Sequence, residues 1–160
     1  NEDEDISLES VTNFYAQSKL MSESIVKKMC PNYLILRCVA LLGTYSRQNS
    51  LIKIAEEKNP VLTLSADSVM NYVLHKQIAD FIKHAIENNL RGIYNAASGE
   101  NITLARVANL LNKKVNFGSY SYSVGEISNR KISKVSSSFA RTSEEIVEQF
   151  LKEDLPKRRH

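Results

Sequence analysis

Short apolar runs alternate with stretches of helical periodicity along this chain, and this alternation constrains the fold more than any other feature. The runs at 33–37 and 92–96 are rich in residues typical of buried strands, although periodicity alone leaves a buried helix open at 33–37. Beside these runs, apolar residues recur at three- and four-residue steps. Because strands that alternate with helices are typical of α/β proteins, we expect an α/β fold.

Local signals mark the ends of the predicted helices. Pro31 stops the first helix, since the residue before a proline is disfavoured in helical conformation. Thr103 is a suitable N-cap, and Thr142 with Glu145 forms a capping-box pattern at the start of the last helix. The predicted helices cover residues 10–29, 51–55, 78–86, 104–111 and 143–152.

Two further short strands are predicted at 61–64 and 69–73, joined by a turn at 65–68. From 118 to 138, serine, lysine and arginine dominate the sequence. Shorter elements and Ser-rich loops are typical of a smaller lobe, so we place a soft domain boundary between residues 116 and 117.

Charge and composition exclude several classes of protein. The net charge of +3 is too small to indicate a nucleic-acid partner, and no apolar run approaches the roughly 20 residues of a membrane span. The acidic start at 1–5 is the opposite of a signal peptide, so we expect a cytoplasmic protein in which Cys30 and Cys38 are reduced thiols. The histidines show no metal-ligand spacing with each other or with the cysteines, and we predict no metal site.

Tyr15 and Lys19 lie one helical turn apart and therefore on the same face of the first predicted helix. A phenol exchanges protons poorly at neutral pH, but a neighbouring cation favours its ionised form. The lysine can also hold ribose hydroxyls while a hydride moves to or from a nicotinamide, with the tyrosine as acid or base. By chance alone, such a pair is more often a half-buried tyrosine beside a solvated lysine.

Four blocks of sequence, in order, carry a resemblance to a known family. An acidic lead-in precedes Tyr15-Ala-Gln-Ser-Lys19, and an apolar strand with a Leu-Arg pair reaches Gly43. An aromatic-Val strand then enters a helix, and Gly92-Ile-Tyr-Asn follows. The order is similar to that of the extended short-chain dehydrogenase/reductase family, which includes sugar-nucleotide epimerases, dehydratases and keto-sugar reductases. The blocks cover 1–23, 33–43, 71–79 and 92–100, and the likeness continues to about residue 152.

The resemblance implies a partial Rossmann-type parallel sheet with helices, followed by a small C-terminal substrate lobe. Residues 1–116 would be the C-terminal part of a Rossmann-like NAD(P)-binding domain with interleaved substrate-lobe segments, and 117–160 the small lobe and basic tail. The glycine-rich turn that receives the pyrophosphate is absent, because no glycines here have its spacing. The family's catalytic Ser or Thr also lies upstream. We therefore expect a fragment that lacks the N-terminal half and is inactive alone.

The family's roles transfer to individual positions. The resemblance implies that Tyr15 is the acid or base and that Lys19 binds the ribose of NAD or NADP. Backbone near the nicotinamide would come from Val39, Ala40 and Leu41, and substrate contacts from Leu42, Arg47, Asn49 and Asn71.

We therefore expect the substrate-side portion of an NAD(P)-dependent sugar-nucleotide epimerase, dehydratase or reductase. Its substrate would be a nucleotide-sugar or keto-sugar, and a homodimer could form through the Tyr15 helix. Ala40 and Leu42 stand where nucleotide-sugar enzymes often carry Asn and Tyr, so we prefer a reductase. One alternative is a non-catalytic binding or regulatory module of the same fold. Another is a different α/β protein in which Tyr15 and Lys19 are ordinary surface residues.

Overall fold

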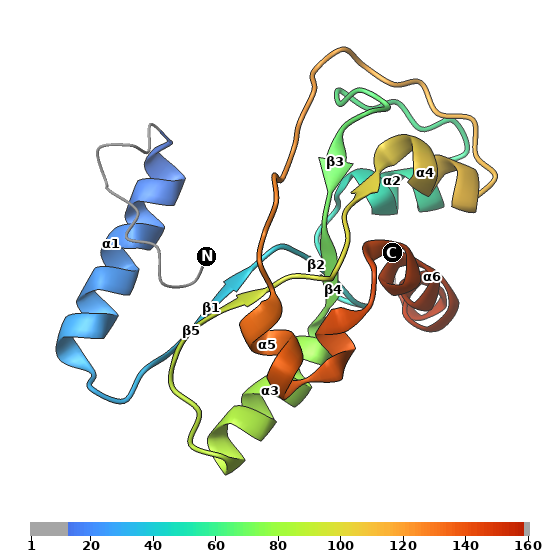
Figure 1. The fold of residues 1–160 in the computed structure, drawn as a ribbon. Helices are drawn as coiled ribbons and strands as arrows, with labels where there is room; N and C mark the ends of the chain where they lie inside the picture. The colour runs from blue at the N-terminus through green and yellow to red at the C-terminus, as the bar shows by residue number, and fades with distance from the viewer. Residues whose placement is uncertain (1–12, 159–160) are drawn as a thin grey trace.

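The computed structural model describes residues 13–158 as helices joined to short strands (Figure 1). The helices are α1 (Phe14–Met29), α2 (Ser50–Glu56), α3 (His75–Glu87), α4 (Leu104–Leu110), α5 (Arg130–Val135) and α6 (Ser143–Glu153). The 3₁₀ helices are η2 (Ser137–Ala140) and η3 (Leu155–Lys157). The strands are β1 (Leu34–Cys38), β2 (Ala40–Leu42), β3 (Val69–Met70), β4 (Tyr72–Leu74), β5 (Gly92–Ala96) and β6 (Ile102–Thr103).

The strands form three pairs, two of them parallel. β1 pairs with β5, and β2 pairs with β4, both in parallel register. β3 pairs with β6 in the antiparallel sense. The nearly continuous extended segment 34–42 therefore changes its partner at Val39, whose N–H still donates to the carbonyl of Ala96 at 3.3 Å. The α/β fold with parallel strands is the one that the sequence predicts.

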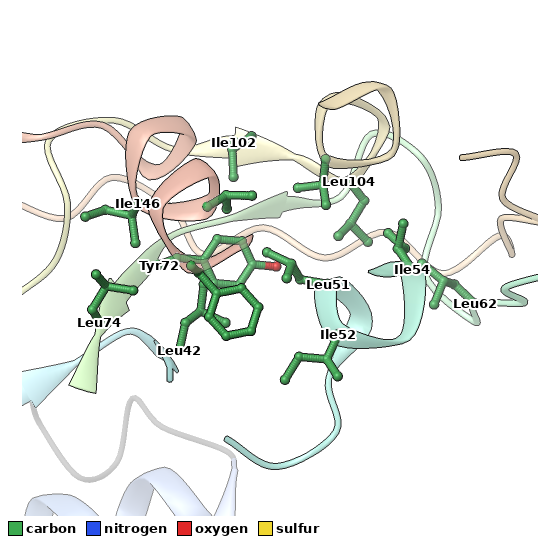
Figure 2. Close-up of a cluster of buried hydrophobic side chains, with 13 residues drawn as sticks. Leu42, Leu51, Ile52, Ile54, Leu62, Tyr72, Leu74, Ile102, Leu104 and Ile146 are labelled. Atoms are coloured by element: carbon green, nitrogen blue, oxygen red, sulfur yellow. The ribbon is translucent and has the colours of Figure 1, made fainter. Parts of the chain in front are cut away.

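Two clusters of buried side chains hold these elements together. The first joins Leu42 of β2 and Tyr72 of β4 to α2 and α4, and Ile146 of α6 packs into the same cluster (Figure 2). The second lies between β5, α3 and η2, where the ring of Phe81 meets those of Tyr94 and Phe139 edge-on at centroid distances of 5.2 and 5.9 Å. Because α6 packs on β4 and its side chains join the first cluster, the C-terminal part of the chain contributes to that core.

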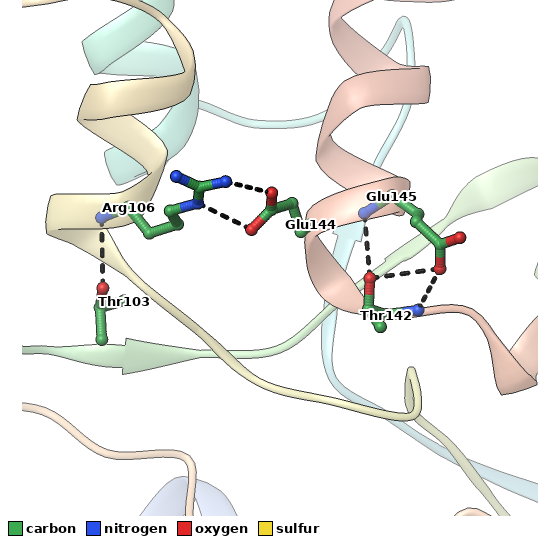
Figure 3. A network of polar contacts seen from close by, with 5 residues as sticks. All are labelled: Thr103, Arg106, Thr142, Glu144 and Glu145. Carbon is green, nitrogen blue, oxygen red and sulfur yellow. Dashed lines mark hydrogen bonds and ion pairs between the residues drawn. The ribbon is translucent and has the colours of Figure 1, made fainter.

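The start of α6 is fixed by its own cap and by an ion pair to α4 (Figure 3). The Thr142 hydroxyl accepts from the Glu145 N–H at 3.2 Å, and a Glu145 carboxylate oxygen accepts from the Thr142 N–H at 2.7 Å. Arg106 of α4 donates two hydrogen bonds to Glu144, at 2.8 and 2.6 Å. These bonds from Arg106 lower the pKa of Glu144, and the bond from the Thr142 backbone lowers the pKa of Glu145.

Several predicted elements are confirmed, and two predictions are wrong. The helix ended before Pro31, the strand near 33–37, the Thr103 N-cap and the capping box all occur. The strands at 61–64 and 69–73 do not form the expected pair. The first makes only isolated bridges, at Val61 and Leu64, and the second is split into β3 and β4. In the region expected to be loops, α5 is an additional helix.

Candidate functional site

Tyr15 and Lys19 share one exposed face of α1. The Asn13 side chain caps the helix by accepting from the Tyr15 N–H at 2.9 Å. The ammonium of Lys19 lies 5.3 Å from the centroid of the Tyr15 ring, which is the geometry of a cation–π contact. Tyr15 as a residue is 69% exposed, and Lys19 is exposed as well. The predicted pair is thus in contact, and both of its polar groups are accessible.

A bidentate ion pair joins α1 to the parallel sheet. Glu23, two turns after Tyr15, accepts from Nε of Arg37 at 3.0 Å and from its Nη2 at 2.8 Å. The two side chains are only 15% and 20% exposed. A planar guanidinium that holds both carboxylate oxygens restrains the rotation of the helix. The ion pair therefore fixes which face of α1 turns toward β1.

The direction of α1 places Tyr15 toward the carboxyl end of β1. The helix and the strand run in roughly opposite senses (Figure 1), and Tyr15 precedes Glu23 by eight residues, or about 12 Å of helix axis. Ligands of open α/β sheets bind beyond the carboxyl ends of the strands. Tyr15 and Lys19 therefore lie on the part of α1 that precedes Glu23, and their place beside a bound ligand stays a prediction.

Residues 39–41, whose backbone is expected near a nicotinamide, lie where the extended segment 34–42 changes its partner from β5 to β4. Val39 and Leu41 pack partly buried against the second cluster, and Ala40 against the first. Leu42 is fully buried in the first cluster, which leaves only its backbone available to a ligand. The structure thus joins these residues in one segment at the carboxyl end of β1.

The loop that follows β2, residues 43–49, brings Arg47 and Asn49 together. The Arg47 side chain is exposed, and its carbonyl accepts from the Asn49 amide at 3.4 Å. The Asn49 side chain also caps α2 by accepting from the Ile52 N–H at 3.1 Å. Arg47 therefore offers an exposed guanidinium, while Asn49 already has a structural role.

Asn71 is the most buried polar residue of the predicted set, at 3% exposure. Its amide oxygen accepts from the N–H and the hydroxyl of Ser98, each at 2.9 Å. Its amide nitrogen donates to the Ser98 carbonyl at 3.3 Å and to Asn101 Oδ1 at 2.9 Å. All four hydrogen-bonding positions are thus occupied by protein. Asn71 fastens the junction of β3 and β4 to the segment after β5, and its role as a substrate contact stays a prediction.

A polar groove of about 1070 Å³ opens beside Asn71. Its walls are Asn71, the turn 98–101, the segment 126–131 and the end of α5 at Lys134 and Val135. Neither Tyr15 nor Lys19 lines it. The groove and the Tyr15 face are therefore separate features of the described structure.

The Glu23–Arg37 ion pair was missed from sequence, although a signal was present. Glu23 continues the four-residue spacing of Tyr15 and Lys19, and Arg37 is a charged residue inside an apolar strand. A charge in such a place is normally paired. The hydrogen bonds between Asn71 and Ser98 have no comparable signal in the sequence.

No helix among residues 13–158 is long and apolar enough to cross a membrane. Within the same range, no group of three or more His, Cys, Asp or Glu side chains could hold a metal ion.

Comparison with known proteins gives a family match and a set of similar structures. Residues 6–145 match the family described as RmlD substrate binding domain. A search of curated proteins found no match.

Three solved structures illustrate the shared fold. The dTDP-4-dehydrorhamnose reductase of Yersinia enterocolitica has a TM-score of 0.71 and 24% identity, over 92% of this chain and 58% of its own. The Bacillus anthracis reductase of the same name, in complex with NADP, scores 0.70 at 21% identity over 95% and 58%. The dTDP-glucose 4,6-dehydratase of Bacillus anthracis, in complex with NAD, scores 0.68 at 16% identity over 96% and 56%. The chain therefore has part of a Rossmann-type fold and spans little more than half the length of these structures.

Proposed function

Because this chain belongs to the RmlD substrate binding domain family, we propose that it is the substrate-side portion of an NAD(P)-dependent sugar-nucleotide reductase, epimerase or dehydratase. The observation that supports this function most strongly is the Tyr15–Lys19 contact on a helix face that Glu23 anchors to the sheet. Family membership removes an unrelated α/β protein as an alternative, whereas the roles of Tyr15 and Lys19 remain part of the proposal. A reductase is preferred among the three reactions, as the sequence suggests.

In this proposal, Tyr15 exchanges a proton with the substrate oxygen and Lys19 binds the nicotinamide ribose. When bound, the dinucleotide supplies or accepts the hydride. The ammonium of Lys19 fits this role because it is exposed and its only described contact is the Tyr15 ring. The five glycines of the chain lack the spacing of a pyrophosphate-binding turn, so the phosphates must be held by residues outside this chain.

The proposed substrate is a nucleotide-sugar or keto-sugar at the 43–49 loop. Arg47 can pair with a phosphate, since its side chain is exposed. Leu42, Asn49 and Asn71 would contribute through backbone or through the shape of the site, because their side chains are buried or already bonded.

The proposal extends to a homodimer through α1. None of the helix's residues is buried, and its apolar side chains at Met21, Ile25 and Met29 are exposed. An apolar stripe of this kind is commonly covered by another chain or domain. The cytoplasmic location expected from sequence stays a prediction.

The first test is calorimetric titration of NADH and NADPH into this chain and into the polypeptide that includes any sequence encoded upstream of Asn1. We expect binding by the longer polypeptide only. Lys19→Met should then weaken that binding. Tyr15→Phe should leave it unchanged. With dTDP-4-dehydrorhamnose, the compound in the name of the similar reductases, as the trial substrate, Tyr15→Phe should lower the rate of reduction by NADPH by about a hundredfold or more. Tyr33→Phe is the matched control, because Tyr33 lies at the opposite end of β1.

Two results would contradict the proposed function. If neither polypeptide binds a dinucleotide, the non-catalytic binding module becomes the better description. If the longer polypeptide binds and Tyr15→Phe turns over normally, Tyr15 is not the acid or base. The 69% exposure of Tyr15 makes this second test necessary.

A further inference from the structure

The loop 43–49, here called the substrate loop, is fastened from the far end of the chain. The hydroxyl of Thr44 donates to Asp154 Oδ1 at 3.1 Å, across 110 positions of sequence. Arg158 Nη1 donates to the carbonyl of Ser46 at 2.8 Å, across 112 positions. Two residues of the loop are thus tied to the segment that follows α6.

That C-terminal segment is a firm support. The Asp154 N–H caps α6 by donating to the Phe150 carbonyl at 3.0 Å, and Leu155 packs against the first cluster. Arg158 also donates to Glu56 at 2.7 Å, and these two side chains are only 12% and 16% exposed. Because an ion pair with so little exposure is weakly screened by salt, Arg158 is held in place.

The tied and free residues alternate along the substrate loop. Thr44 and Ser46 carry the long-range bonds, whereas Tyr45 is 92% exposed and Arg47 is exposed. The free side chains are an aromatic ring, which can stack on a sugar, and a guanidinium, which can pair with a phosphate. Because Thr44 and Ser46 are held in place, the backbone positions from which the side chains of Tyr45 and Arg47 extend are held as well.

We propose that Asp154 and Arg158 are positioning residues that hold the substrate loop so that Tyr45 and Arg47 meet the sugar and phosphate of a nucleotide-sugar. This inference rests on the proposed function and adds Tyr45 as a contact. A loop that is already ordered loses less conformational entropy when it binds. The C-terminal segment thus raises affinity without touching the ligand.

Two substitutions test the inference from different directions. Arg158→Gln removes the bond to Ser46 but also leaves Glu56 without its partner, which weakens the fold. Thr44→Val removes only the hydroxyl bond to Asp154 and leaves no buried charge. Lys157→Gln is the matched control, because this exposed neighbour changes charge by the same amount.

The measurements are hydrogen exchange of peptides that span 44–48 and titration with dTDP-4-dehydrorhamnose, both on the longer polypeptide. For Arg158→Gln, we expect exchange in the substrate loop and the Kd to rise by about tenfold each, with smaller rises for Thr44→Val. The turnover rate at saturating substrate should stay unchanged, and Lys157→Gln should match wild type in every readout.

Two outcomes overturn the inference. Unchanged exchange in Arg158→Gln and Thr44→Val means that the C-terminal segment does not hold the loop. Faster exchange with unchanged affinity means that it supports the fold but positions no substrate contact. A wild-type polypeptide that binds no dinucleotide is a failure of the proposed function, and it is recognised separately because it needs no substitution.

Discussion

Replacing Tyr72 with phenylalanine should stabilise the protein. The residue is 1% exposed inside the first cluster, and its hydroxyl has no hydrogen-bond partner in the described part of the chain (Figure 2). Burial raises the pKa of Tyr72 well above its ordinary value. The Tyr72 hydroxyl has therefore lost its hydrogen bonds to water on folding, and no protein hydrogen bond among the described residues replaces them.

The magnitude follows from the cost of that unpaired group. A buried hydroxyl without a partner costs about 1–3 kcal/mol. Removing the oxygen of Tyr72 also leaves a small void, whose lost contacts offset part of the gain. We expect the free energy of unfolding to rise by about 1 kcal/mol, or the Tm by about 2–4 °C for a chain of this length.

Urea and thermal unfolding followed by circular dichroism would measure the change. The urea m-value should stay constant, since the surface exposed on unfolding is the same. Tyr120→Phe is the control, because Tyr120 is exposed and its loss of a hydroxyl should change stability by less than about 0.5 kcal/mol. If Tyr72→Phe instead destabilises the protein by about 1 kcal/mol, the hydroxyl has a partner and the reasoning is wrong.

Three further changes have expected outcomes. Gly118→Ala should destabilise the protein by about 2 kcal/mol in urea unfolding, because the added Cβ would lie 2.2 Å from the Thr63 carbonyl oxygen. Arg106 lowers the pKa of Glu144 below its unfolded value, so this pair stabilises the fold above the ordinary carboxyl range. That contribution is lost as the pH falls through the folded pKa, and Glu144→Gln should flatten the acid limb of a Tm-against-pH curve. Glu23→Gln should lower Tm and speed proteolysis of α1, whereas equal protease resistance would contradict the anchoring role.

Local signals in the sequence predicted the elements better than their pairing. The Thr103 cap and the capping box of Thr142 are short-range patterns, and both occur as expected. The segment 69–73 has the composition of one strand, yet Asn71 interrupts it because its amide bonds to Ser98. A contact across 27 positions has no local signature.

In the candidate site, too, the local pattern could be predicted from the sequence and the long-range contacts could not. The spacing of Tyr15 and Lys19 predicted a shared helix face, and their side chains are in contact. The ties from Asp154 and Arg158 to the substrate loop join residues more than a hundred positions apart, so no sequence window contains both ends. Arg158 belongs to the basic C-terminal tail, and its bonds to Glu56 and Ser46 cannot be predicted from the composition of that tail.

The change of partner at Val39 has a consequence for how the chain acquires its structure. Each half of the segment 34–42 pairs with a strand that lies much later in the sequence, so both pairings are non-local. Non-local parallel pairings form slowly, because the entropy of loop closure is lost before the stabilising contacts between the strands can form. During synthesis, β1 cannot pair with β5 until β5 has emerged, even after β2 and β4 can meet. A nascent chain that stops before Gly92 would therefore present the edge of β1 that β5 normally covers to chaperones or to other chains.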